Sequence, residues 1–155
     1  MRFCHGQSGN GVAPFEALML TGLAAFRRPH GFPTERALAG LTTHVLDVTR
    51  GGPARAMRVE LYELAGDDGR NLVADVETNA DGRSDKPLIA PADARVGRFE
   101  LVFHAGDYFR AEGMRLADPP FLDRVPIRFA IADPGAHYHV PLIVSPWSYS
   151  TYRGS

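Results

Sequence analysis

Side-chain type alternates with a period of two over residues 137–144, and this pattern restricts the folds that are possible for the chain. Every second residue is apolar: Tyr138, Val140, Leu142 and Val144. The residues between them are two histidines, a proline and an isoleucine: His137, His139, Pro141 and Ile143. Because successive side chains of a β-strand point to opposite faces, the run predicts a strand with one apolar face. The two histidines share the opposite face. Ser145-Pro146 then ends the strand, and a second extended run, Tyr149–Ser155, follows.

The same alternation recurs along the chain between short turns. Strands are predicted over Leu41–Thr49, Met57–Tyr62, Leu72–Thr78, Phe99–Phe103 and Val125–Ile131, and turn residues such as Gly51-Gly52-Pro53 and Asp81-Gly82 separate them. One segment, Ala105–Met114, has the pattern of a short helix. We therefore predict an all-β fold, a two-sheet antiparallel sandwich of about eight strands from Leu41 to Ser155 with one short helix.

Composition narrows the classes of partner. The 155 residues suffice for one domain with a sizeable core, and the formal net charge of -1 offers no electrostatic reason to bind nucleic acid or an acidic membrane. Cys4 is the single cysteine, so neither an intrachain disulfide nor a cysteine metal cluster can form.

Residues 1–39 form an N-terminal extension of uncertain role, and residues 40–155 form the predicted domain. The apolar run Ala17–Phe26 is too short to span a bilayer. The segment is also a poor signal peptide, because the charged residue Glu16 interrupts it. The interpretation we favour is a short helix from about Pro14 to Arg27, with Pro29 and Pro33 stopping it. A targeting signal and a wrongly assigned start codon are the alternatives.

Three side chains in the domain have the chemistry of hydrolysis. His44 and His139 lie on the more polar faces of their strands, and histidine, with an ordinary pKa of about 6.5, can accept a proton from water near neutral pH. Arg83 follows the turn Asp81-Gly82. Its guanidinium can bind a planar ring bidentately and stabilise negative charge on a carbonyl oxygen. Each residue alone is also compatible with a solvated surface position.

The C-terminal tail is rich in hydrogen-bonding groups. The phenol of Tyr152, the guanidinium of Arg153 and the hydroxyl and terminal carboxylate of Ser155 can all contact a polar ligand, and Gly154 allows the backbone to approach closely. A tail that only packs as a last strand is the alternative.

Other chemistries are weakly supported. His137 and His139 share a strand face and have the chemistry of two metal ligands, with His44 or an aspartate as a candidate third, but no third ligand stands at a recognisable spacing. The sequence contains no nucleophile elbow, glycine-rich phosphate loop or dinucleotide motif. We therefore predict that the protein uses no metal and no organic cofactor.

Three motifs resemble one family. The segments Leu41–Asp47 (LTTHVLD), Thr78–Arg83 (TNADGR) and the terminal HYHVP with SPWSYSTYRGS are similar to the 5-hydroxyisourate hydrolases, the enzyme branch of the transthyretin-like family. The resemblance covers about Gly40 to Ser155. It implies a transthyretin-like sandwich and a homotetramer with sites in a channel at the dimer–dimer interface.

The resemblance also implies an activity. Members of this branch hydrolyse 5-hydroxyisourate, the product of urate oxidation, to 2-oxo-4-hydroxy-4-carboxy-5-ureidoimidazoline without a cofactor. Their catalytic residues map onto His44, Arg83 and His139, and their substrate-binding residues onto His44, Arg83, Tyr152, Arg153 and Ser155. Either His44 or His139 can be the general base.

The rival hypothesis is a transthyretin-type carrier that binds a small aromatic ligand in the channel, although such a carrier has no need of two histidines and an arginine. We expect cytoplasmic localisation, or periplasmic if residues 1–39 are a targeting signal.

Overall fold

The computed structural model describes residues 40–66 and 69–154. All described residues lie in one compact unit. The elements of the first half are β1 (Gly40–Thr42), β2 (Val45–Asp47), β3 (Gly52–Pro53), β4 (Arg58–Ala65), β5 (Gly69–Glu77) and the 3-10 helix η1 (Pro91–Asp93). Those of the second half are β6 (Gly97–Phe103), α1 (Ala105–Ala111), β7 (Val125–Ile131), β8 (His137–His139), β9 (Leu142–Ser145) and β10 (Ser148–Thr151). The predicted extension 1–39 lies outside the described residues.

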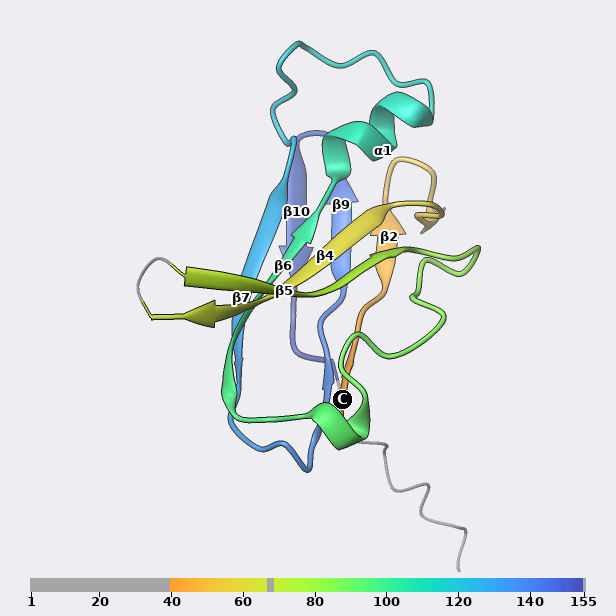
Figure 1. Cartoon of the computed structure of the whole chain (residues 1–155). Coiled ribbons are helices and arrows are strands. Elements are labelled where there is room, and N and C mark those ends of the chain that lie inside the picture. Colours follow the sequence, from red (N-terminus) through yellow and green to blue (C-terminus); the bar gives the residue numbers. More distant parts are fainter. Residues whose placement is uncertain (1–39, 67–68, 155) are drawn as a thin grey trace, which may run out of the picture. The chain divides into compact units, whose positions relative to one another are not determined.

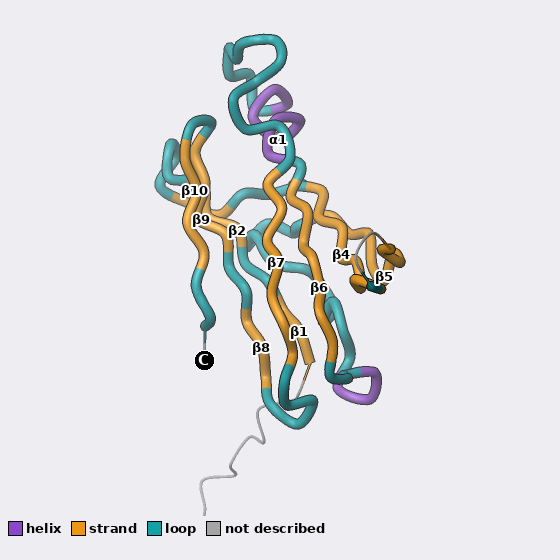
Figure 2. The backbone as a smooth tube through the Cα atoms, turned by 90° about the vertical axis from the view of Figure 1, so that its left-hand side faces the viewer, coloured by secondary structure: helices purple, strands orange, loops and turns teal. Residues whose placement is uncertain are grey.

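The strands form two layers (Figures 1 and 2). One layer is the antiparallel sheet β5-β4-β6-β7. The other is the sheet β10-β9-β2-β3, which the pair β1-β8 extends. Within this second layer, two backbone hydrogen bonds connect the pair β1-β8 to the pair β2-β9: Val140 N–H donates to Thr42 O at 3.0 Å, and Leu142 N–H donates to His44 O at 2.9 Å. The ladder from β1-β8 to β2-β9 is therefore continuous, and the all-β sandwich with one helix is confirmed.

Two pairings differ from the expected antiparallel arrangement. The strand β1 pairs with β8 in parallel, and β2 pairs with β9 in parallel. The returning strands are separated from β1 and β2 by the whole of the other sheet, so no tight turn forces them to run in the opposite direction. The sequence did not reveal this, because alternation of side chains has a period of two in both kinds of ladder.

The core lies between the layers, where the apolar faces meet. The predicted inward residues of 137–144 are all buried, as are their counterparts across the core: Tyr138, Val140, Leu142 and Val144 from one sheet, and Val59, Leu61, Phe99, Leu101 and Phe103 from the other. Strand β5 departs from this pattern, because Leu72 is 55% exposed. Leu72 pairs with Tyr62 just past an irregularity in the β4-β5 register. Beyond that irregularity the hairpin reaches away from the opposite sheet (Figure 1).

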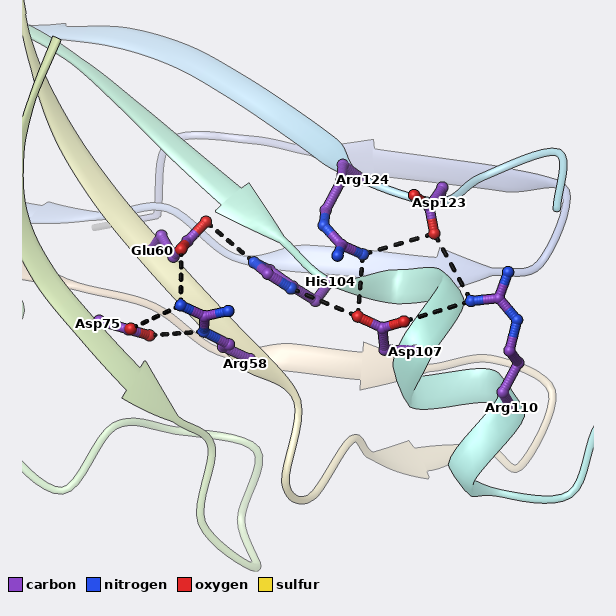
Figure 3. Close-up of polar contacts among 8 residues, drawn as sticks. All are labelled: Arg58, Glu60, Asp75, His104, Asp107, Arg110, Asp123 and Arg124. Atoms are coloured by element: carbon purple, nitrogen blue, oxygen red, sulfur yellow. Dashed lines mark hydrogen bonds and ion pairs between the residues drawn. The ribbon is translucent and has the colours of Figure 1, made fainter. Parts of the chain in front are cut away.

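The helix α1 begins directly after β6 and is anchored by polar contacts. His104 is buried, and its Nε2 lies 2.9 Å from Glu60 Oε2 on β4. Its Nδ1 lies 3.6 Å from Asp107 on the first turn of the helix. Arg58 contacts both Glu60 and Asp75, at 2.9 and 2.8 Å. Figure 3 shows this network continuing from Asp107 to Arg110 on the helix and to Asp123 and Arg124, which directly precede β7.

Tyr108 ties α1 to the other sheet. Its phenol donates to Asp47 Oδ2 on β2 at 3.0 Å, and burial raises the pKa of Tyr108 to about 12. The phenol therefore stays protonated near neutral pH, and so remains a donor. Because Asp47 lies three residues after His44, this bond also fixes the strand that carries the site.

Candidate active site

His44 lies where the first strand segment passes into the second. Burial alternates without a break from Leu41 to Asp47, so Thr43 faces the core while Thr42 and His44 face outward and are half-buried. The Thr43 hydroxyl donates to Val140 O at 2.8 Å, which holds the junction of β1 and β2 against the neighbouring strands. Thr42 and His44 therefore lie side by side on the outward face of this sheet.

A tight loop carries Arg83 to His44. The Asn79 side-chain oxygen accepts from the backbone N–H groups of Asp81 and Arg83, at 3.0 and 3.1 Å. Gly82 has φ 70° and its carbonyl accepts from Val45 N–H at 2.8 Å, while a Cβ on Gly82 would collide with the Val45 carbonyl oxygen. Only glycine fits this backbone conformation and this close approach. The loop therefore packs on β2, and the backbone of Arg83 forms an isolated antiparallel β-bridge with that of His44.

The tail runs beside β8 and packs on His139. Gly154 N–H donates to His139 O at 2.8 Å. A Cβ on Gly154 would lie only 2.6 Å from the Cδ2 atom of the imidazole ring. The tail therefore touches the ring itself, and a side chain on Gly154 would displace it. This contact gives residue 154 a direct connection to the predicted site.

One hydroxyl joins the two histidines of β8. Thr42 Oγ1 lies 3.1 Å from His137 Nε2 and 2.9 Å from His139 Nδ1. Thr42 and His139 are paired in the parallel register of β1 and β8, which places the three side chains in a row on the outward face.

The electrostatics of the site favour neutral histidines. Burial, and then the positive charge of Arg83, lower the pKa of His44 below its ordinary value of 6.5, although a hydrogen bond to the Asp81 backbone opposes this. Burial also lowers the pKa of His139, and Arg83, His44 and His137 add to the effect. A cation next to a histidine disfavours the imidazolium. Both rings are therefore unprotonated near neutral pH, which is the form that a general base needs.

The predicted site residues do not all point the same way. His44, Arg83 and His139 come together and influence one another electrostatically. The Arg153 guanidinium instead lies over the Tyr138 ring, 4.7 Å from its centroid. Tyr138 is on the core side of β8, opposite the histidines, so Arg153 lies beside a depression of about 330 Å³ between the tail and β7. Tyr152 is 58% exposed and lines the same depression, and Ser155 lies outside the described residues.

Thr42 was missed as a site residue, and His137 entered the sequence argument only as a metal ligand. The signal for Thr42 was available, because it stands two residues before His44 and so shares its face.

In the part of the chain that the structure describes, no group of three or more His, Cys, Asp or Glu side chains is arranged to hold a metal ion.

Comparisons with known proteins place this geometry in a family. A family model, HIUase/Transthyretin family, matches residues 41–154. The 5-hydroxyisourate hydrolase 2 of Rhizobium meliloti is 58% identical over 115 residues, which are 74% of this chain and 95% of that protein. The 5-hydroxyisourate hydrolase of Deinococcus radiodurans is 54% identical over 116 residues, 75% of this chain and 96% of that one.

Solved structures agree with these relatives. The structure of Klebsiella pneumoniae 5-hydroxyisourate hydrolase superposes with a TM-score of 0.60 at 34% identity, over 74% of this chain and 98% of that one. An (S)-allantoin synthase superposes with a TM-score of 0.71 at 46% identity, over 76% of this chain and 44% of that one. The sandwich, the three motifs and these matches lead to one conclusion: the chain belongs to the HIUase/Transthyretin family.

Proposed function

We propose that this protein hydrolyses 5-hydroxyisourate to 2-oxo-4-hydroxy-4-carboxy-5-ureidoimidazoline in urate degradation. The observation that carries the proposal is the meeting of His44, Arg83 and His139 on one sheet face, in a chain 58% identical to a protein named for this activity. Two neutral imidazoles beside a guanidinium are suited to opening a small, polar, planar ring.

The proposed reaction is hydrolysis of a ring amide. A neutral histidine accepts a proton from water while the water oxygen bonds to the ring carbonyl carbon. Arg83 holds the ring and donates to the oxygen on which negative charge develops. The carbonyl re-forms, the bond from its carbon to the ring nitrogen breaks, and the histidine returns the proton to that nitrogen. General base catalysis supplies typically 10²–10⁴-fold, and one oxyanion donor roughly 10²–10³-fold.

Substrate binding by Tyr152, Arg153 and Ser155 is part of the proposal. Gly154 packs on the His139 ring, so the tail backbone borders the site. Tyr152 and Arg153 follow the end of β10 and both line the depression beside β7. To reach a ligand beside His139, Arg153 would have to leave Tyr138, and Tyr152 would have to turn out of the depression.

The proposed assembly is a homotetramer with its sites in a channel between dimers. The outward face around His44 and His139 is half-buried and carries several uncharged polar groups, which suits a face that meets another subunit. Light scattering should give a mass four times that of the chain at micromolar concentration. A monomer with full activity would contradict the assembly.

The decisive experiment follows the ultraviolet absorbance of freshly generated 5-hydroxyisourate. The absorbance should decay faster with the protein than in buffer, and an equal amount of heat-denatured protein should have no effect. Activity should survive EDTA, as expected for a reaction without metal. Saturable binding of the substrate without any faster decay would contradict the hydrolase and favour the carrier.

Cytoplasmic localisation stays a prediction, as does the periplasmic alternative. Among the described residues no helix is long and apolar enough to cross a bilayer. Cell fractionation of a producing strain, with N-terminal sequencing of the mature protein, distinguishes the two compartments.

A further inference from the structure

The Thr42 hydroxyl stands between two imidazole nitrogens, Nε2 of His137 at 3.1 Å and Nδ1 of His139 at 2.9 Å. A hydroxyl has one proton to donate and two lone pairs with which to accept. Thr42 therefore cannot donate to both rings, and at least one of the two imidazoles must donate to it. The protonation pattern of the two histidines is coupled through this single oxygen.

The His139 ring is restricted in position, because Thr42 lies on one side of it and Gly154 on the other. Thr42 lies on β1 directly opposite His139, and its carbonyl accepts from Val140 N–H at 3.0 Å. A β-branched side chain in a strand has a restricted χ1 angle, so the position of Oγ1 is well defined. On the other side the tail closes in, because Gly154 leaves no room for even a Cβ atom next to the ring. Nδ1 is thus held on Thr42, and Nε2 is the nitrogen left to act.

The geometry at Thr42 favours one of the possible patterns. The groups that influence His139 are Arg83 from the 79–83 loop, His44 from the junction of β1 and β2, and His137 from its own strand. When His139 accepts a proton at Nε2, its Nδ1–H needs an acceptor, and Thr42 Oγ1 is within reach at 2.9 Å. The threonine proton is then free to go to His137 Nε2.

We propose that Thr42 is a positioning residue that holds His139 as the Nδ1–H tautomer, leaving the lone pair of Nε2 as the general base, while its own hydroxyl donates to His137. This rests on the proposed function. In the hydrolysis, the water proton moves to His139 Nε2 and later to the leaving ring nitrogen, and Thr42 keeps its own proton throughout. In this arrangement the general base is His139.

The chain offers a matched set of variants for the test. Thr42→Val keeps the shape of the side chain and removes the hydroxyl, whereas Thr42→Ser keeps the hydroxyl. Thr43→Val is the control, because it removes the hydroxyl of the next residue, which faces the core and donates to Val140 O. Each variant is compared with the parent by circular dichroism and oligomeric mass, and kinetics are expressed per folded molecule.

The kinetic readout separates positioning from packing. Thr42→Val should lower kcat/KM by about 10- to 100-fold, the range for a hydrogen bond to a charged group, mainly through kcat. It should also move the acid limb of the kcat/KM profile to lower pH, because the imidazolium loses its acceptor. Thr42→Ser should recover most of the rate and the position of the limb. Thr43→Val should lower the unfolding midpoint and leave both kinetic features in place.

The tautomer can be read without any turnover. Nitrogen-15 spectra of histidine-labelled protein above pH 7.5 should show Nδ1 of His139 protonated and Nε2 unprotonated, with His139→Gln used to assign the signals. In Thr42→Val this preference should be lost. If the parent does not hydrolyse 5-hydroxyisourate, the proposed function fails, but the spectra still decide the role of Thr42. An Nε2–H tautomer in the parent, or parental kinetics and an unmoved limb in Thr42→Val, overturns the positioning role.

Discussion

His104 is buried and His139 is half-buried, and their neighbours carry opposite charges. His104 lies between two carboxylates, with Glu60 at 2.9 Å and Asp107 at 3.6 Å. His139 is surrounded by Arg83 and two other histidines and hydrogen-bonds a neutral hydroxyl. Residue type alone would not tell them apart.

The sign of the neighbouring charges decides what each ring can do. The hydrogen bond from His104, together with the charges of His104 and Arg58, holds the pKa of Glu60 below its ordinary value of 4.5. That pairing uses His104 as a fixed partner that joins β4 to α1. Burial, and then the positive charge of Arg83, instead lower the pKa of His139, which favours the neutral ring. His104 is therefore part of the framework, whereas the surroundings of His139 fit the role of proton acceptor that we propose for it.

The largest effect that the comparison predicts is the loss of activity in His139→Gln. Removal of a general base typically costs 10²–10⁴-fold in rate, and we expect kcat/KM to fall within that range. The thermal midpoint should move little, because the ring lies on the half-buried outward face, opposite the buried side chains of Tyr138 and Val140. Parental kinetics in a folded His139→Gln protein would show that His139 is not the base.

Arg83→Met should have the next largest effect. Loss of an oxyanion donor typically costs roughly 10²–10³-fold in kcat. The same change removes one of the causes that lower the pKa values of His44 and His139. The acid limb of the pH–rate profile should therefore move to higher pH. A limb that stays in place would mean that Arg83 is too far from the rings to influence them.

A smaller effect is that the parent protein should lose activity and lose stability in two different pH ranges. The pKa of His139 is lowered in the fold, so activity should be retained at pH 6.5 and fall about tenfold per pH unit only below the lowered value. The pKa of Glu60 is also lowered, so its contribution to stability is present above 4.5 and lost as the pH falls through its folded value. Activity should thus disappear reversibly while circular dichroism still reports a folded domain. Simultaneous loss of both would contradict the separation.

His104→Leu should leave the chemistry alone. Glu60 would lose a hydrogen bond in a poorly solvated position, and we expect the free energy of unfolding to fall by about 1–3 kcal/mol. Because the pKa of Glu60 would rise toward its ordinary value, acid unfolding should begin at higher pH. His104→Gln, which keeps one donor, should restore part of the loss. A change in kcat/KM per folded molecule would show that the two histidines communicate.

Sequence reasoning found the strands and the short helix because alternation and turn residues are local signals. It found the burial of Val140, Leu142 and Val144 for the same reason. It did not find that β8 and β9 run parallel to β1 and β2, because direction leaves no mark on a period of two. The strand breaks between Thr42 and Val45 and at Val140-Pro141 were also not anticipated.

For the site, the residues alone suggested chemistry but not proximity. The loop of Arg83 reaches His44 only because Gly82 can dock on Val45, a tertiary contact that the turn motif did not specify. The bridge from Thr42 to His139 spans 97 positions along the chain. Such pairs follow from the register of β1 and β8, which becomes known only when the sheet is assembled.

The parallel pairing of β1 with β8 also bears on how the protein is made. A ribosome adds roughly 5–20 residues per second, so the 97 positions from Thr42 to His139 take about 5 to 20 s to synthesise. During that time β1 and β2 have no partner from β8 or β9, and contacts between distant residues are slow to form even afterwards. The antiparallel sheet β4 to β7, which needs only neighbouring segments, can assemble first. Catalytic competence is thus among the last properties that a newly made molecule acquires.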